Sequence, residues 1–274
     1  MINKLKSFFV TREKIRENTR NLMVKNTGDK EIGNDSTEEP LFSKFSDFEN
    51  RKVLNKWERI TGKSNVIISF VSDPKGSTFY SSRVSSLVNT INNLGYDYII
   101  VHYDSDRNYH ENCCYKPLFI KNLLEKTQKN LIWIDGDTNL KKNIDPFINE
   151  DKDFDLGLVT YNNSVTGFLA SPLFLRCTET TKDLLKDWSN HCRKEIESGR
   201  CELDHDALKH TILPLYKDRI RICLNWNKEN DLHNGSILEN VDSKVPSKGE
   251  IIRKITEINK LRPFVLTNQD FKIV

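Results

Sequence analysis

Apolar and polar positions vary along the chain with the periods of strands and helices in turn. Residues 65–71 (NVIISFV) are almost continuously apolar, and residues 96–103 form a second such run. Runs of this length are typical of strands buried on both faces of a parallel sheet. Gly95 stands where a C-cap glycine belongs, after apolar side chains at helical spacing: Val84, Leu87, Val88, Ile91 and Leu94. We therefore predict a strand–helix–strand unit with a right-handed crossover, in an α/β fold.

The second half of the chain continues this alternation. Further strands are predicted over residues 131–134, 155–161, 167–175 and 219–224. Thr178 is expected to open a long helix whose apolar face consists of Leu184, Leu185, Trp188, Cys192 and Ile196. Trp188 shares the spacing of its aliphatic neighbours, which indicates a core residue. Asp204 and Asp206 are expected to open the next helix, with Ala207, Leu208 and Ile212 on its inner side.

Two carboxylates follow one of these apolar runs directly. In the segment LIWIDGDTN, Asp135 and Asp137 come after residues 131–134, with Gly136 between them. In an open α/β sheet, the ligand crevice lies outside the carboxyl ends of the strands. Oxygen ligands suit Mg²⁺ or Mn²⁺, which carboxylates usually hold together with the phosphates of a substrate. The pattern predicts a metal site for a diphosphate; the alternative is that both aspartates only cap a turn.

Three further segments, together with this one, resemble a known family. They are YKPLFI (residues 115–120), TGFL (166–169) and DHDAL (204–208), in that order along the chain. In order and spacing they are similar to the motifs of the nucleotide-diphospho-sugar transferases, which are GT-A glycosyltransferases with an aspartate-x-aspartate motif. The resemblance covers about residues 64 to 235. His205 departs from it, because the family has glutamine at this position.

The resemblance implies a GT-A fold and the transfer of a sugar. The fold would have a Rossmann-like, mostly parallel central sheet flanked by helices. The activity would be a metal-dependent hexosyl transfer from a nucleoside-diphosphate sugar to an acceptor hydroxyl, with a lean toward retention of the anomeric configuration. Asp135 and Asp137 would hold Mn²⁺ or Mg²⁺ on the diphosphate. The acceptor class stays open between glycan, lipid-linked sugar, protein and modified nucleic acid.

The same resemblance places the nucleotide over the ends of the first strands. Ser69 and Ser72 would then lie near the base, and Asp104 would accept hydrogen bonds from the base or ribose. Asp104 can equally be an ordinary turn aspartate. Arg83 is expected either to reach a phosphate or to form a surface ion pair.

Lys116 precedes a proline, a residue that fits the first turn of a helix. Lys116 would therefore lie at a helix N-terminus, where a diphosphate would explain a cation that the helix dipole does not favour. The alternative is a solvated lysine beside a helix cap.

Three other residues complete the expected site. Gly167 would allow close approach by the acceptor or the transferred sugar, or would simply begin a strand. Asp204 would act as a base toward the acceptor or stabilise the reacting sugar, although a helix-capping role would also explain an aspartate there. His233, in a polar turn after the last core strand, is the candidate third metal ligand, with an exposed loop histidine as the alternative.

Two other functions remain as alternatives. A haloacid-dehalogenase-type phosphatase also has paired aspartates at a strand end, but it requires Thr or Val where Asn139 stands. A catalytically silent GT-A domain that serves as a binding or assembly module is the other, because fold does not imply function.

Composition is that of a globular protein, with 37% hydrophobic and 30% charged residues in 274. The six cysteines contain no CxxC pair and the formal charge is only +3, so neither a zinc cluster nor nucleic-acid binding is indicated. We expect residues 1–62 to form a basic helical extension and linker, and residues 63–274 to form the catalytic domain. No apolar run reaches the ~20 residues of a membrane span. A cytoplasmic location is expected, with peripheral membrane contact through the basic helix as a further option.

Overall fold

The computed structural model describes residues 51–73, 78–104, 107, 109–140, 153–160, 164–198, 202–224, 238–240 and 267–274. The expected N-terminal helix and His233 lie outside the described residues. Within them, no helix has the length and apolar character needed to cross a membrane.

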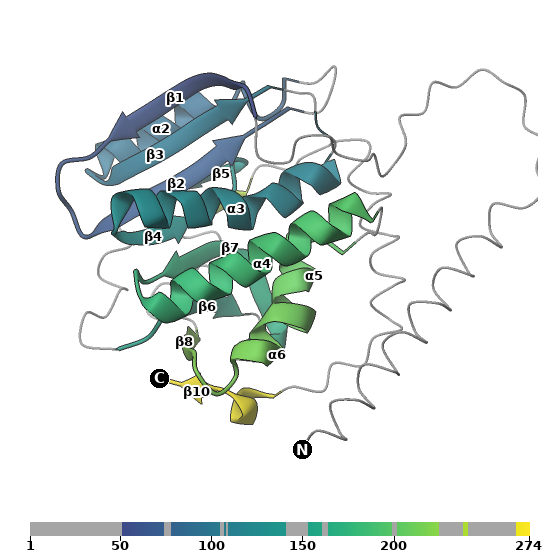
Figure 1. The fold of residues 1–274 in the computed structure, drawn as a ribbon. Helices are drawn as coiled ribbons and strands as arrows, with labels where there is room; N and C mark the ends of the chain where they lie inside the picture. The colour runs from purple at the N-terminus through teal and green to yellow at the C-terminus, as the bar shows by residue number, and fades with distance from the viewer. Residues whose placement is uncertain are drawn as a thin grey trace, which may run out of the picture.

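An eight-stranded sheet forms the centre of the structure (Figure 1), in the order β1-β3-β2-β4-β7-β6-β8-β10. Its strands are β1 (Val53–Arg59), β2 (Asn65–Val71), β3 (Asp97–Tyr103), β4 (Asn130–Trp133), β6 (Leu156–Thr160), β7 (Phe168–Leu175), β8 (Arg221–Leu224) and β10 (Lys272–Ile273). A separate two-stranded ribbon pairs β5 (Thr138–Leu140) with β9 (Leu238–Asn240). The ribbon follows directly after Asp135 and Asp137 in the chain, because β5 begins at the next residue.

The sheet is mixed, with parallel pairings in the majority. The pairs β2–β3, β2–β4, β6–β8 and β8–β10 are parallel, whereas β1–β3, β4–β7 and β6–β7 are antiparallel. The predicted α/β class is therefore confirmed. The antiparallel β7 lies between β4 and β6 and divides the parallel strands into two groups.

Helices cover both faces of the sheet. On one face, α2 (Val84–Asn93) packs Val84, Leu87 and Ile91 against side chains of β2 and β3. On the other face lie α3 (Tyr109–Thr127) and α4 (Glu179–Glu197), side by side in Figure 1, with α5 (Asp204–Ala207) and α6 (Leu213–Tyr216) beyond them. Side chains of these two faces form two separate hydrophobic cores.

Several predicted elements are confirmed. The unit β2–α2–β3 has parallel strands, and Gly95 adopts a φ of +75°, as a C-cap glycine does. Thr178 is the N-cap of α4, and its side chain accepts a hydrogen bond from the backbone N–H of Thr181. Trp188 is buried in the core, as its spacing indicates.

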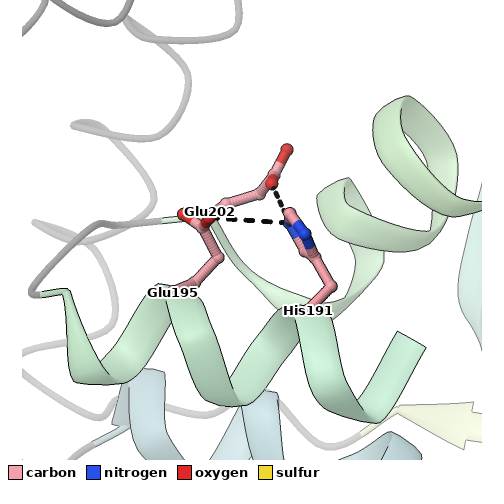
Figure 2. Close-up of side chains that lie close together, drawn as sticks. All are labelled: His191, Glu195 and Glu202. Atoms are coloured by element: carbon pink, nitrogen blue, oxygen red, sulfur yellow. Dashed lines mark hydrogen bonds and ion pairs between the residues drawn. The ribbon is translucent and has the colours of Figure 1, made fainter. Parts of the chain in front are cut away.

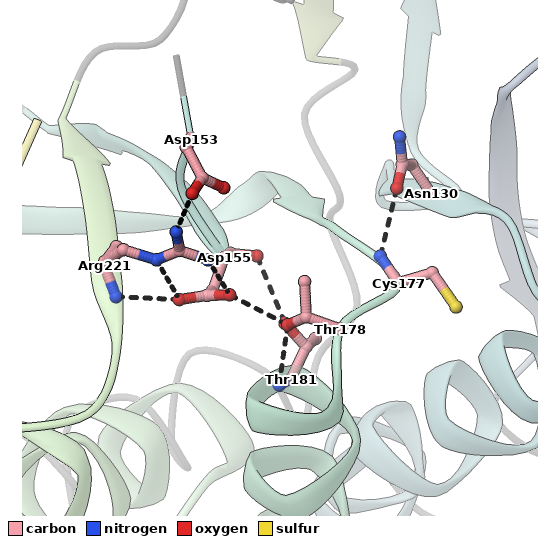
Figure 3. A network of polar contacts seen from close by, with 7 residues as sticks. All are labelled: Asn130, Asp153, Asp155, Cys177, Thr178, Thr181 and Arg221. Carbon is pink, nitrogen blue, oxygen red and sulfur yellow. Dashed lines mark hydrogen bonds and ion pairs between the residues drawn. The ribbon is translucent and has the colours of Figure 1, made fainter.

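A buried carboxylate joins the start of α4 to two strands (Figure 3). Asp155, just before β6, accepts hydrogen bonds from the backbone and the guanidinium of Arg221 on β8, at 3.0 to 3.1 Å. It also accepts one of 2.8 Å from the Thr178 hydroxyl. Burial raises the pKa of Asp155, but the hydrogen bonds from Arg221 and Thr178 outweigh it and hold the pKa below its usual value.

The predicted start of the helix that carries Lys116 is wrong. Pro117 lies inside α3, which begins at Tyr109, so Lys116 does not lie at a helix N-terminus. Proline favours the first helical turn because an N–H there has no partner within the helix. In α3, the tertiary packing of a 19-residue helix holds Pro117 in the interior, and one backbone hydrogen bond is lost. A phosphate contact by Lys116 can therefore not be argued from a helix N-terminus.

The chain from α5 to α6 is helical throughout, with a π-helical turn over Leu208–Ile212. In this turn, the N–H of Leu213 donates to the carbonyl of Leu208. Pro214 follows directly and has no N–H to donate, which favours a local change of the hydrogen-bond pattern. Such turns often lie beside functional residues.

Candidate active site

The turn Asp135–Gly136–Asp137 lies against the end of β2. A Cβ atom added to Gly136 would lie 2.6 Å from Cγ1 of Val71 and 3.0 Å from the carbonyl oxygen of Phe70. The first distance is shorter than Cβ contacts in real structures and the second is unusually tight, so glycine lets this turn pack closely on the neighbouring strand. The two aspartates are half-buried at the carboxyl end of β4, which runs parallel to β2. This is the end of the sheet where the metal site is predicted.

Three elements hold Asp135 in place. Its Oδ1 accepts a hydrogen bond of 2.7 Å from the indole N–H of Trp133 and lies 3.4 Å from Nζ of Lys116. Its backbone N–H donates to the Ser171 hydroxyl of β7, at 3.0 Å. In the described part of the chain, the contacts of this carboxylate all fall on Oδ1. The side chain is 38% exposed and Oδ2 can serve a cation, so the residue fits a metal ligand.

Lys116 connects this turn to the start of α5. Its side chain is only 7% exposed, and its Nζ lies 2.9 Å from Oδ2 of Asp204. The ammonium also lies 5.2 Å from the centre of the Trp133 ring, a distance at which a cation–π attraction acts. Burial lowers the pKa of Lys116, but Asp135 and Asp204 outweigh it and raise the pKa above the ordinary lysine value. Lys116 is therefore charged and shared by the two carboxylates.

Asp204 is the most enclosed of these groups, with a side chain that is 4% exposed. Its backbone carbonyl accepts a 2.8 Å hydrogen bond from the indole N–H of Trp188, which ties the start of α5 to α4. Among the described residues, Oδ2 has no aligned hydrogen bond, although Lys116 lies within ion-pair distance. A buried carboxylate with an oxygen that accepts no hydrogen bond from the described residues is a candidate for contact with a bound ligand.

The face of α3 that carries Lys116 contributes two residues that the sequence reasoning missed. Tyr109 and Cys113 precede Lys116 by seven and three positions, which is one face of a helix. Cys113, burial, Tyr80 and Asp135 all raise the pKa of Tyr109. Burial, followed by the charge of Asp204, raises the pKa of Cys113. Both side chains are therefore neutral groups close to the carboxylates, and helical spacing from Lys116 could have identified them.

The residues expected near the base lie at different depths. Ser69 is fully buried within β2, and its hydroxyl has no hydrogen-bond partner among the described residues. Ser72, at the end of the strand, donates a 2.6 Å hydrogen bond to the backbone carbonyl of Asp104. The structure thus brings Ser72 and Asp104 together at the ends of β2 and β3, while Ser69 stays in the core.

Arg83 lies at the start of α2 and folds over its own turn. Its guanidinium carbon is 3.8 Å from the centre of the Phe79 ring, and Nη1 donates to the carbonyl of Phe79 at 2.8 Å. Asp73, which the sequence reasoning missed, is buried nearby and accepts hydrogen bonds from the backbone N–H groups of Tyr80 and Ser81, the first at 2.6 Å. The chain before α2 is thereby held against the end of β2.

Gly167 ends a short 3₁₀ turn (Val165–Gly167) immediately before β7. The next residue, Phe168, packs edge-to-face with the His205 ring, and Nε2 of His205 lies 3.0 Å from the Phe168 carbonyl oxygen. An Nε2–H tautomer donates this hydrogen bond. His205 therefore fastens α5 to the start of β7, at the position where the resembled family has glutamine.

The structure thus brings Lys116, Asp135 and Asp204 into direct contact, with Asp137 two residues from Asp135 in the same turn. No protein-family model matches this chain, and no curated protein sequence does either. Solved structures do match it. The first is a glycosyltransferase involved in the glycosylation of the major capsid of PBCV-1, with 14% identity, a TM-score of 0.46, and coverage of 70% of this chain and 100% of that one.

Two others belong to the same broad class. The galactosyltransferase LgtC, in complex with donor and acceptor sugar analogues, has 9% identity and a TM-score of 0.37, over 73% of this chain and 97% of that one. The apo form of the glycosyltransferase GlyE from Streptococcus pneumoniae TIGR4 has 10% identity and a TM-score of 0.42, over 65% and 54%. All three structures are glycosyltransferases. The chemistry of this chain has to be derived from its own side chains, because such a likeness concerns the fold.

Proposed function

We propose that the chain is a glycosyltransferase that transfers a sugar from a nucleoside-diphosphate sugar, with a divalent cation on Asp135 and Asp137. The observation that carries this proposal is the contact of Lys116 with both Asp135 and Asp204. This contact supports the proposal, because the Asp135–Asp137 turn and the carboxylate of Asp204 meet at one buried ammonium. A turn that merely caps a strand requires no such arrangement.

Each group has a role in the departure of the nucleoside diphosphate. Mn²⁺ or Mg²⁺ bound to Asp135 and Asp137 would supply Lewis-acid neutralisation of charge on the leaving diphosphate. Lys116 adds a positive charge at the same place, and the surrounding apolar side chains strengthen its field. Asp204 also contacts Lys116 and offers a carboxylate oxygen to the positive charge that develops on the sugar.

A bound diphosphate would compete with the two carboxylates for Lys116. In the structure, the ammonium lies 2.9 Å from Asp204 and 3.4 Å from Asp135, so it is already paired before any substrate arrives. A shift of Lys116 toward the diphosphate would release Oδ2 of Asp204 for the reacting sugar. Retention of the anomeric configuration is the outcome that the family resemblance favours.

The test is thermal unfolding with nucleoside diphosphates and sugar nucleotides, each with and without Mn²⁺. A ligand that binds only the native state increases the free energy of unfolding, by about 2.7 kcal/mol at a ligand concentration of a hundred times Kd, and thereby raises Tm. We expect a Mn²⁺-dependent rise with one nucleotide, and its loss in Asp137→Ala. Asp183→Ala is the matched control, because Asp183 is an aspartate on α4 with a 59% exposed side chain.

Turnover is the second readout. The native chain should release the nucleoside diphosphate from its sugar nucleotide by slow hydrolysis when no acceptor is present, and Asp204→Asn should abolish this while keeping the Tm rise. Nucleotide binding without release would leave a binding module. If the native chain shows neither binding nor release with any nucleotide of the panel, the proposal is overturned and the Asp135–Asp137 turn has a structural role only.

A further inference from the structure

A second group of metal-ligating side chains lies between α4 and the start of α5, and it shares no residue with the candidate active site (Figure 2). His191 and Glu195 are one helical turn apart on α4 and therefore project from the same face. Glu202 reaches the same point from the segment that leads into α5. Three potential ligands from two parts of the chain thus converge.

Their spacing is that of a metal ligand set. Nε2 of His191 lies 2.6 Å from Oε2 of Glu202 and 3.7 Å from Oε1 of Glu195, and the three ligand atoms are all within 4.8 Å of one another. Ligand atoms about 2.0–2.2 Å from a tetrahedral Zn²⁺ lie roughly 3.3–3.6 Å apart. The two histidine distances fall on either side of this value, so small rotations of the side chains would suffice for coordination.

Burial and charge also favour a cation here. The Glu195 and Glu202 side chains are only 3% and 4% exposed, and that of His191 is 15% exposed. The charge of a divalent cation would be equal and opposite to that of the two carboxylates together. Imidazole nitrogen and carboxylate oxygen are both Zn²⁺ ligands, and three of them leave the fourth position of a tetrahedral ion to a water molecule.

We propose that His191, Glu195 and Glu202 bind a Zn²⁺ ion that holds the segment before α5 on α4. The hydroxyl of Thr211, 3.5 Å from Oε2 of Glu202, would orient that carboxylate from the helical region after α5. Glu202 precedes Asp204 by two residues. The ion would therefore fix the position of the carboxylate that contacts Lys116, and it has a structural role in the active site without touching substrate.

The test separates this site from the one at Asp135 and Asp137. In the Asp135→Asn/Asp137→Asn chain, freed of metal with a chelator, equilibrium dialysis against Zn²⁺ should give one bound ion per chain and a rise in Tm. His191→Gln or Glu202→Gln in the same background should weaken binding by more than the ~10- to 100-fold cost of losing an outer-sphere partner. Glu197→Gln, a change of a 56% exposed glutamate on the same helix, should leave binding unchanged.

If the folded parent does not bind one Zn²⁺ ion per chain, the proposal is overturned and the cluster is an ion-paired cross-link. Binding that survives in both variants overturns it as well. If both variants lose their circular dichroism and do not fold, Co²⁺ added to the folded parent decides the matter. Its d–d bands without thiolate-to-cobalt charge transfer support the His–Glu–Glu site, whereas charge transfer shows cysteine ligands and overturns it.

Discussion

At Gly136 the surroundings leave no room for a side chain. We predict that Gly136→Ala destabilises the fold by about 1–3 kcal/mol, because its Cβ would overlap Val71 and approach the Phe70 carbonyl. It should also weaken Mn²⁺-dependent nucleotide binding, since the aspartates on both sides must move with the backbone. Urea unfolding and the thermal shift measure the two effects. In Gly136→Ala/Val71→Ala, where the closest overlapping atom is absent, the two losses should be less than additive; full additivity would contradict this explanation.

Lys116 compensates the buried carboxylate of Asp204, apart from its proposed contact with a diphosphate. Lys116→Met should therefore cost about 3–5 kcal/mol of stability, as the removal of one partner from a buried ion pair does. Lys116→Met/Asp204→Asn should recover much of that loss, because it removes the buried carboxylate that loses its cation, while the other carboxylate, Asp135, is 38% exposed to solvent. Urea unfolding of the four chains of this cycle measures the coupling, and a double variant no more stable than Lys116→Met would contradict it.

The direction of the pKa shift of Lys116 determines how its contribution to stability depends on pH. The pKa of Lys116 is raised on folding, so its stabilisation is complete below the unfolded pKa of about 10.4 and declines as pH rises through the folded value. The difference in unfolding free energy between the native chain and Lys116→Met should thus stay constant from pH 7 to pH 9. A difference that falls within this window would show that Lys116 is not paired as described.

Among the elements, the junction of β6, β8 and α4 depends on Asp155. Asp155→Asn should cost about 2–4 kcal/mol, since it weakens the charge-assisted hydrogen bonds from Arg221 and Thr178. Because the folded pKa of Asp155 is lowered, its stabilisation is present above about pH 4 and is lost as pH falls through the folded pKa. Acid unfolding of the variant should therefore be less steep. Asp183→Asn, a change at an exposed ion pair, should unfold like the native chain.

Elements with a single strong periodicity could be predicted, and those whose form depends on packing could not. β2 has the bounds that its apolar run indicates, and α2 ends before Gly95 as its helical stripe indicates, because both patterns act locally. The start of α3 could not be predicted, because Pro117 in an isolated segment favours a helix start and only contacts with α4 and the sheet hold it mid-helix. β1 could not be predicted for a related reason: most of its side chains are exposed, and only Trp57 and Arg59 are partly buried.

The site shows the same division. Asp135 and Asp137 could be singled out from residue type and position after an apolar run, which are local features, whereas Lys116 and Asp204 were singled out through the family resemblance. The contact of Lys116 with Asp204 joins α3 to α5, which are far apart in the sequence. It depends on α4, which lies between them in the sequence and holds the start of α5 through Trp188. The same holds for His191, Glu195 and Glu202, where a turn of helix could be read from the sequence but the approach of Glu202 could not.

For the whole molecule, the sheet extends beyond the predicted domain boundary at residue 63. β1 pairs with β3 along its length, and Arg51, just before it, places its guanidinium 4.0 Å from the centre of the Tyr115 ring and donates a 2.6 Å hydrogen bond to Asn112. Arg51 is buried, so these contacts fasten the start of the sheet to α3, the helix that carries Lys116.

A chain that starts at residue 63 should therefore differ sharply from one that starts at residue 51. Without β1, the backbone groups of β3 become an open edge that can pair with other chains, and α3 loses its contacts with Arg51. We expect the shorter chain to aggregate or to unfold at a clearly lower urea concentration than the longer one. Arg51→Ala in the longer chain separates the two causes, since it removes the α3 contacts and keeps the strand. Equal stability of the chains that start at 51 and 63 would mean that β1 is an accessory strand and that the domain begins at β2.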